Sequence, residues 1–312
     1  MNTQVQYPET LMEAVKYFSD LDVCHDTVVE HRWPEGVRCV HCASEKVTYL
    51  TTRRKFQCRN CRRTFSVKHG TIFEDSPLGL DKWLVALWVI VSAKNGVSSY
   101  EIHRALGVTQ KTAWFMMHRI RLALQDTEDG GKLSGEVEVD ETFIGGKARF
   151  MHKSKRSKMK GASGTVGKIA VMGLLERKGK VRMKVIENIR RKNLDPHVRA
   201  NIEAGSTVYT DALPSYESIA DEYVHNVIDH AECYVRGNIH TNGMENFWSL
   251  LKRGLKGTYV SVEPFHLFRY LDEQAFRFNH RKTTDRNRFD EAIKSIAGKR
   301  LTYKRLTGEC VS

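Results

Sequence analysis

Four cysteines arranged as two CxxC pairs are the feature that most constrains the fold of this chain. Cys39 and Cys42 form the first pair, Cys58 and Cys61 form the second, and the strand-like segments KVTYL and KFQC lie between them. This spacing is typical of a zinc ribbon, in which four thiolates hold one structural Zn²⁺ tetrahedrally. Because the segment is too small to build its own core, we expect metal binding to supply its folding free energy.

Two disulfides are the alternative to zinc, and they need an oxidising compartment. The N-terminal stretch MNTQVQYPET lacks the charged and apolar regions of an export signal. The apolar segment WLVALWVIVSA is shorter than the roughly 18 residues of a membrane span. We therefore expect a cytoplasmic protein with no membrane partner and with reduced thiols.

The charge of the chain favours a polyanionic partner. Its 312 residues carry a net charge of +13, and Lys and Arg release counterions when they neutralise phosphates. Double-stranded DNA is the leading candidate, which predicts association with the bacterial nucleoid. Within the ribbon the predicted DNA contacts are Arg53, Arg54, Lys55, Arg62 and Arg63, although simple solvation also explains such charges.

The segment 98–124 has the pattern of a helix-turn-helix. Ile102, Ala105 and Leu106 form one apolar face, Gly107 supplies the turn, and Thr109 caps a second helix. The residues that we expect to face outward are Gln110, Lys111, Trp114, His118 and Arg121, and the predicted DNA contacts among them are Gln110, Lys111, His118 and Arg121. A purely structural pair of helices is the alternative, since many such pairs touch no DNA.

A polar, Gly-rich linker, TEDGGKLSG, marks a domain boundary, and the region after it has the pattern of alternating strands and helices. The order of expected elements is three strands, a helix, a strand, a helix, a strand and a final helix. EVEVDETFIGG is the first strand, STVYTD is the fourth, and the final helix begins near His240. Such a mixed α/β layout is the ribonuclease H-like arrangement, in which the first and fourth strands are neighbours.

Three of these elements carry a carboxylate suited to metal-dependent phosphoryl transfer. Asp140 and Asp211 lie on the first and fourth strands, and Glu245 lies on the final helix, with Lys252 two turns further along. Two Mg²⁺ or Mn²⁺ ions need carboxylates that converge from rigid elements, so this set predicts a two-metal site. Taken alone, Glu245 and Lys252 also fit an ordinary solvated helix face.

The motifs DETFIGGK, VYTDALPSY and HTNGMENFWSLLKRGLKGTY resemble those of the DDE superfamily of transposases, and more closely the zinc-ribbon-bearing insertion-sequence branch of the ISXO type. The resemblance runs from the ribbon to about Arg281. It implies that Asp140, Asp211 and Glu245 are the three acids and that Lys252 is the associated lysine. Some relatives are described with Asn as third ligand, so Asn242 is kept as an auxiliary candidate; a carboxylate holds a dication better, which favours Glu245.

The segment between Gly146 and Lys168 is strongly basic and contains no acid. It directly follows the predicted strand that carries Asp140, and this position favours a DNA clamp at the active site. A flexible, solvated loop is the alternative. The clamp residues would be Lys153, Lys155, Arg156, Lys158 and Lys160.

Together these patterns predict a multidomain protein. The expected parts are an N-terminal helical segment at 1–35, a zinc ribbon at 36–67, a helix-turn-helix region at 77–126, a ribonuclease H-like catalytic domain at 134–281 and a helical tail at 282–312. The predicted function is DNA transposition, with cleavage at element ends and joining of the 3′ hydroxyl to target DNA. Cutting two ends together implies a homo-oligomer, at least a dimer. The alternatives are a DNA-binding regulator with a degenerate α/β domain and a ribonuclease H-like nuclease without strand transfer.

Overall fold

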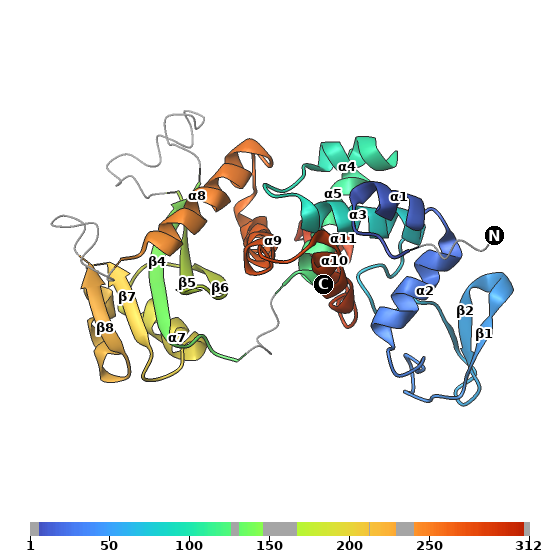
Figure 1. Ribbon diagram of the computed structural model, residues 1–312, viewed down its shortest axis with the longest axis horizontal. Helices are drawn as coiled ribbons and strands as arrows, with labels where there is room; N and C mark the ends of the chain where they lie inside the picture. Colours follow the sequence, from blue (N-terminus) through green and yellow to red (C-terminus); the bar gives the residue numbers. More distant parts are fainter. Residues whose placement is uncertain (1–5, 126–130, 146–166, 212, 229–239, 309–312) are drawn as a thin grey trace. The chain divides into compact units, whose positions relative to one another are not determined.

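The computed structural model describes residues 6–125, 131–145, 167–211, 213–228 and 240–308. The chain forms two compact units (Figure 1). The N-terminal unit contains Met1–Gln125 together with His280–Ser312, and the sheet unit contains Asp126–Asn279. Within the described ranges, no helix has both the length and the apolar character that a membrane span requires.

Helix α3 is the centre of the N-terminal unit. It spans Leu80–Ser92, and its Trp83 and Trp88 are fully buried. Five other helices of this unit pack on it, and α10 comes from the C-terminal end of the chain. The unit's other α-helices are α1 (Leu11–Tyr17), α2 (Leu21–Arg32), α4 (Ser99–Leu106), α5 (Gln110–Ala123), α10 (Asp285–Lys294) and α11 (Tyr303–Thr307).

The ribbon is a small antiparallel sheet with strand order β1-β2-β3. Strand β1 spans Val47–Leu50, β2 spans Lys55–Cys58 and β3 spans Thr64–Phe65, with a 3-10 turn, η1 (Thr51–Arg53), between the first two. This confirms the strand-turn-strand pattern expected between the CxxC pairs.

Helices α4 and α5 form a close pair joined by a short turn. Ser98 and Glu101 form a capping box at the start of α4, and Gly107 ends that helix in the left-handed conformation at φ 61°. The Thr109 side chain accepts a hydrogen bond from the backbone N–H of Thr112 at the start of α5. Both helices and the predicted cap of the second are therefore present.

The sheet unit is built on a five-stranded mixed sheet with the order β6-β5-β4-β7-β8. Strand β4 pairs antiparallel with β5 and parallel with β7, and β7 pairs parallel with β8. The first and fourth strands of this unit are thus neighbours, as predicted. The strands are β4 (Glu136–Ile144), β5 (Ile169–Glu176), β6 (Val181–Ile186), β7 (Thr207–Asp211) and β8 (Val224–Ile228).

Helices cover both faces of this sheet because β4 alternates two kinds of side chain. Val137 and Val139 point into a core shared with α7 (Arg191–Asn201) and the 3-10 helix η4 (Pro214–Asp221). The opposite face packs against α8 (Asn242–Gly257) and α9 (Leu267–Asn279), which follows the short η5 (Pro264–His266). Figure 1 shows α8 lying across β4 and β5, which places its side chains over the polar face of β4.

Candidate active site

The parallel pairing of β4 with β7 brings Asp140 and Asp211 together. The register pairs Glu136 with Thr207 and Glu138 with Tyr209, so continuing it by two residues sets Asp140 across from Asp211. Asp140 lies in the middle of β4, just beyond the stretch that pairs with β7, and Asp211 is the last residue of β7. Their carboxylate oxygens belong to a cluster in which all ligand atoms lie within 4.8 Å of one another.

Glu141 is the third member of that cluster and is not among the acids predicted from the sequence. It follows Asp140 directly, so its side chain leaves β4 on the opposite face, where the Tyr216 hydroxyl of η4 donates a hydrogen bond to its Oε1. Burial, and then repulsion by Asp211 and Asp140, raises the pKa of Glu141 to about 9. The signal in the sequence is the pair of consecutive carboxylates, Asp140 and Glu141, on the predicted first strand.

The Asp140 carboxylate is held by two hydrogen bonds. The Trp248 Nε1–H donates to its Oδ2 at 2.9 Å, and the backbone N–H of Glu141 donates to its Oδ1 at 2.8 Å. Desolvation raises the pKa of Asp140 to about 6 despite these bonds, and the nearby charges of Asp211 and Glu245 add to the rise. Trp248 is therefore both a core residue and a direct partner of a predicted catalytic acid.

Helix α8 can approach the sheet this closely because residue 173 of β5 is a glycine. Gly173 pairs with Asp140 in the antiparallel register. A Cβ at this position would meet the Met244 side chain and would lie 2.7 Å from Trp248 Cζ2. Any larger residue would push α8, and with it Trp248, away from Asp140.

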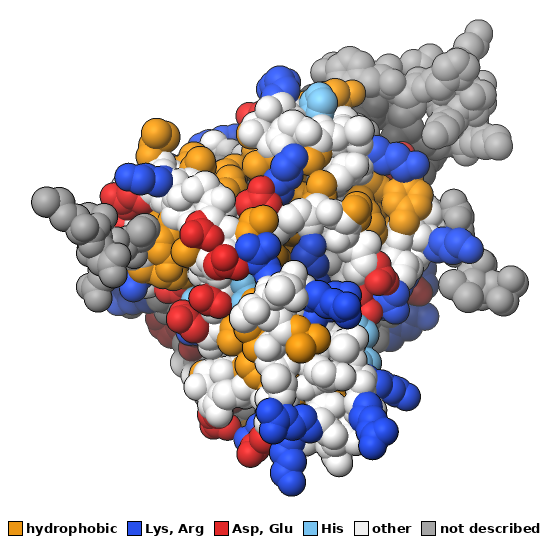
Figure 2. Space-filling view, turned by 90° about the vertical axis from the view of Figure 1, so that its right-hand side faces the viewer, with side chains coloured by type: hydrophobic (Ala, Val, Ile, Leu, Met, Phe, Trp, Pro, Cys, Tyr) orange, Lys and Arg blue, Asp and Glu red, His pale blue; other side chains and the backbone are white. Residues whose placement is uncertain are grey.

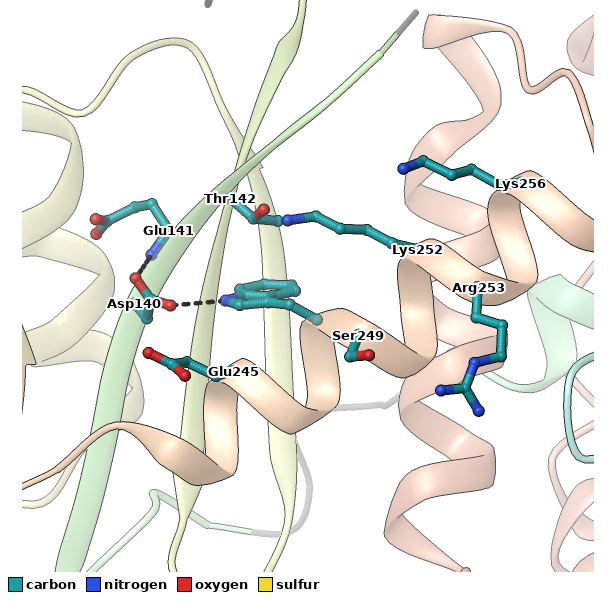
Figure 3. Close-up of a pocket in the computed structure, with 9 residues that line it drawn as sticks. Asp140, Glu141, Thr142, Glu245, Ser249, Lys252, Arg253 and Lys256 are labelled. Carbon is teal, nitrogen blue, oxygen red and sulfur yellow. Dashed lines mark hydrogen bonds between the residues drawn. The ribbon is translucent and has the colours of Figure 1, made fainter. Parts of the chain in front are cut away.

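A cavity of about 620 Å³ lies between this helix and β4. Figure 3 shows the Asp140 and Glu245 carboxylates at one end, with the Glu141 carboxylate directed away from α8, and Lys252, Arg253 and Lys256 further along the helix. Its lining residues are Asp140, Glu141, Thr142, Glu245, Trp248, Ser249, Lys252, Arg253 and Lys256. The cavity thus joins an acidic end suited to cations with a basic end suited to phosphates.

Lys252 has a reduced preference for its charged form. Burial lowers the pKa of this ammonium, and the nearby Lys256 and Lys168 lower it further, while Asp140 acts in the opposite direction. In Figure 3 its side chain runs back along the cavity toward Thr142. Asn242, the auxiliary candidate, is exposed at the first residue of α8 and is not among the residues that line the cavity.

The four ribbon cysteines form a second cluster. Their sulfurs all lie within 4.8 Å of one another, with Cys39 and Cys61 3.6 Å apart and Cys42 and Cys58 also 3.6 Å apart. An S–S bond is about 2.05 Å long, whereas a tetrahedron with Zn–S distances of about 2.3 Å has edges of about 3.8 Å. The backbone N–H of Cys61 donates to the Cys58 sulfur at 3.5 Å, a contact that favours the thiolate form that a metal binds. The geometry fits a tetrahedral metal and excludes disulfides at these spacings.

Comparisons with known families match both parts of the chain. The family model of the ISXO2-like transposase domain matches residues 132–279, and that of the transposase zinc-ribbon domain matches residues 20–64. An uncharacterized transposase-like protein of Haemophilus influenzae is 33% identical over 104 residues, which cover 33% of this chain and 84% of that protein. The chain belongs to the ISXO2-like transposase family. An uncharacterized protein in transposable element ISH50 of Halobacterium salinarum is also 28% identical over 298 residues, covering 91% of this chain and 98% of that protein.

The basic residues selected in the ribbon of this transposase family member are all exposed. Arg54 Nε forms an ion pair with Asp22 Oδ1 at 2.5 Å, so part of its charge is already compensated. Figure 2 shows Lys and Arg side chains gathered at the lower end of the N-terminal unit's face, where Figure 1 places the ribbon. This surface has the charge that a phosphate backbone requires.

The expected outward orientation of His118 and Arg121 is wrong. Both side chains are buried, at 0% and 1% exposure. Helix α5 packs against α3, α4 and the C-terminal α11, so more of its circumference is covered than a one-sided apolar pattern indicates. Lys111 remains exposed and lies over the Tyr303 ring, and Gln110 Nε2 donates a hydrogen bond to Ser99 Oγ at 2.9 Å. The predicted clamp residues Lys153, Lys155, Arg156, Lys158 and Lys160 lie outside the described residues.

Proposed function

We propose that this chain is a metal-dependent DNA transposase that cuts DNA at the ends of an insertion sequence and joins the resulting 3′ hydroxyl to target DNA. The observation that carries the proposal is the convergence of Asp140, Asp211 and Glu141 beside a cavity that also contains Glu245 and a row of basic side chains. A nuclease or strand-transfer site needs this combination, because metal ions and phosphates occupy adjacent positions.

The carboxylates fit a pair of hard divalent cations, Mg²⁺ or Mn²⁺. Oxygen atoms from rigid strands are the ligands these ions prefer. The pKa values of the partly buried Asp140 and Glu141 are raised, so added positive charge nearby would favour their ionised forms. We assign Asp140, Asp211 and Glu245 as the ligands, with Glu141 beside them. When bound, such ions activate a water or 3′ hydroxyl and stabilise the leaving oxygen.

The residues around the acids have separate roles. The Trp248 indole and the Glu141 N–H fix both oxygens of Asp140, which leaves the remaining lone pairs in a defined direction. Lys252, Arg253 and Lys256 are assigned to the phosphates of the DNA strand that enters the cavity. Position and charge carry the reaction in this scheme, so no protein nucleophile is needed.

The N-terminal unit is assigned to recognition of the element ends. The four cysteines would hold one structural Zn²⁺, and the exposed ribbon residues Arg53, Lys55, Arg62 and Arg63 would contact the DNA backbone. The α4 and α5 pair would act as a helix-turn-helix, with Gln110 and Lys111 at the exposed start of its second helix.

The sheet unit is assigned to the ribonuclease H-like arrangement. The strand order β6-β5-β4-β7-β8 supports this, because three antiparallel strands are followed by two that run parallel to the first. Since two element ends must be cut together, a homo-oligomer, at least a dimer, is proposed in the DNA complex.

The test is to incubate the full-length protein with DNA carrying the flanking element ends and Mg²⁺, and to sequence the joined products. Junctions between element 3′ ends and target DNA, absent with Asp140→Asn, are expected. Cleavage without junctions would replace the proposal with a nuclease. End binding without cleavage in any divalent ion would replace it with a DNA-binding regulator.

A further inference from the structure

Glu138 is a buried carboxylate that the proposed reaction does not use. It lies on β4 two residues before Asp140, so both side chains leave the strand on the face that α8 covers. Glu138 is 2% exposed, and burial of a charge at this depth is costly unless its oxygens are fully hydrogen-bonded.

Both Glu138 oxygens accept hydrogen bonds. Oε1 accepts from Arg177 Nε at 3.0 Å, and Oε2 accepts from the backbone N–H of Met244 at 2.9 Å. The same guanidinium donates to the carbonyl oxygen of His240 at 2.8 Å, just before α8 begins. The contacts therefore tie the first turn of α8 directly to β4.

Met244 is the third residue of α8, where a helix carries a backbone N–H without an intrahelical partner. Within the described part of the chain, the residue at the usual capping position, Thr241, makes no side-chain capping bond. A carboxylate from a strand more than a hundred residues earlier supplies the missing acceptor. The start of α8 is thus fixed by tertiary contact instead of by its own sequence.

Every second residue on this face of β4 lies opposite every fourth residue of α8. Glu138 meets Met244 and Asp140 meets Trp248, while Thr142 lines the cavity with Lys252. Four helical residues advance about 6 Å and two strand residues about 6.6 Å, so the two spacings stay in step. Residue 243 is a glycine, and a Cβ there would lie 2.7 Å from Glu138 Oε2, so the strand carboxylate reaches the helix end because that space is open.

We infer that Glu138 is a positioning residue: by capping α8 from β4, it sets where the helix stands along the strand and hence where Glu245 lies relative to Asp140. This inference rests on the proposed function, in which Asp140 and Glu245 bind metal ions together and must therefore be held at a fixed spacing. Glu138 itself touches neither metal nor DNA. Its effect passes through the first turn of α8.

Glu138→Gln is the sharpest variant, because it keeps the shape and removes one of two acceptors. A carboxamide has one acceptor oxygen and one N–H₂ donor, so whichever way it is turned a donor faces Arg177 or the Met244 N–H. Glu138→Asp keeps both acceptors on a shorter stem and serves as the second variant. Glu136→Gln is the matched control, since Glu136 also pairs with Arg177, at 3.5 Å, and is half exposed.

The readout is Mn²⁺ binding to the full-length protein, followed by electron paramagnetic resonance, with Asp140→Asn defining the signal of this site. Glu138→Gln is expected to weaken Mn²⁺ binding about tenfold, as outer-shell changes do. Hydrogen exchange of the α8 N-terminal amides should rise in the same variant, and Glu138→Asp should fall between it and wild type. Glu136→Gln should match wild type in both measurements.

Wild-type Mn²⁺ affinity in Glu138→Gln and Glu138→Asp would overturn the inference and leave the proposed function intact. If Glu138→Gln does not fold, wild-type Mn²⁺ affinity in Glu138→Asp alone overturns it. If the wild-type protein shows no Mn²⁺ signal that Asp140→Asn removes, the proposed function fails first, and the role of Glu138 falls with it.

Discussion

The indole of Trp248 donates a hydrogen bond to Oδ2 of Asp140 at 2.9 Å, so a core residue of α8 directly orients a carboxylate of β4. The same contact sets the depth of α8 on the sheet, because Gly173 leaves room for the Trp248 ring. The Trp248 side chain therefore both packs α8 on the sheet and orients Asp140, and a substitution can remove the hydrogen bond while keeping the packing.

Trp248→Phe should retain most of the packing and lose the hydrogen bond. Hydrogen bonds to charged groups contribute about 1.5 to 3 kcal/mol to the stability of the arrangement they hold. Without this bond Asp140 is less firmly oriented, so we expect cleavage to slow at least about tenfold while binding to element ends is unchanged. Trp83→Phe is the control, because it loses an equivalent bond, from Nε1 to Ser76 Oγ at 3.0 Å, within the N-terminal unit. Single-turnover cleavage at the wild-type rate by a folded Trp248→Phe protein would show that the bond is not needed.

The burial of Trp248 could be predicted from the sequence, but its hydrogen bond to Asp140 could not. In the sequence, Met244, Phe247, Trp248, Leu251 and Leu255 recur at helical spacing, which indicates the buried face that the structure shows. This spacing does not indicate which polar atom the Trp248 indole meets across the sheet. The pairing of Asp140 with Asp211 was predictable because strand order follows from the sequence of elements. Glu141 was missed because alternation along a strand assigns neighbours to opposite faces, and that rule does not exclude two adjacent carboxylates whose oxygens lie close together.

His118 and Arg121 illustrate a different limit. Their helix has a polar side in the sequence, but it packs against α3, α4 and α11, and α11 comes from the far end of the chain. Local periodicity cannot reveal a long-range contact of this kind. The same holds for Glu138, a polar residue between Val137 and Val139, because only its contact with α8 shows that its side chain is buried.

The pH dependence of stability should reveal the buried acids. Without added divalent ions, Glu141 keeps its proton in the folded state up to a pKa of about 9, while the unfolded chain releases it near the ordinary value of 4.5. The folded state then binds more protons, so the free energy of unfolding falls as pH rises between these values, by at most about 1.4 kcal/mol per pH unit. Asp140 adds to this fall in the free energy of unfolding between pH 3.8, its ordinary pKa, and its raised pKa of about 6.

Glu141→Gln should flatten this slope and raise stability at about pH 8 in the absence of Mg²⁺. The measurement is urea unfolding of both proteins across the range from about pH 5 to pH 8. Glu217→Gln, an exposed substitution next to Tyr216, is the control and should keep the wild-type slope. An unchanged slope in Glu141→Gln would contradict the assignment of a buried, protonated carboxyl.

The ribbon should contain about one zinc per chain. Cys58→Ser should lose the metal and unfold the ribbon, because zinc binding supplies its folding free energy. Cys24→Ser is the matched control, since the Cys24 thiol is buried at α2, near the Phe18 carbonyl, and lies outside the sulfur cluster. Metal analysis of freshly reduced protein decides the point, and protein that is folded and free of zinc would refute it.

The exposed arginines of the ribbon should bind DNA through phosphates. Arg62→Ala and Arg63→Ala should each weaken binding and reduce the slope of log affinity against log salt by about 0.9. Lys16→Ala, at an exposed position on α1 outside the ribbon, should leave that slope unchanged. Fluorescence anisotropy at several salt concentrations measures both quantities, and equal slopes in all variants would remove the ribbon from the DNA-binding surface.

A strand-joining assay tests whether the three acids carry the reaction, using Asp140→Asn, Asp211→Asn, Glu245→Gln and Asn242→Ala, with end binding measured in parallel. A dication needs charged oxygens, so the three acid variants should bind element ends normally and form no joined product, while Asn242→Ala should still join. Joining at the wild-type level by Glu245→Gln together with its loss in Asn242→Ala would transfer the third-ligand role to Asn242. Wild-type joining by Asp140→Asn would rule out metal-dependent strand transfer at this site.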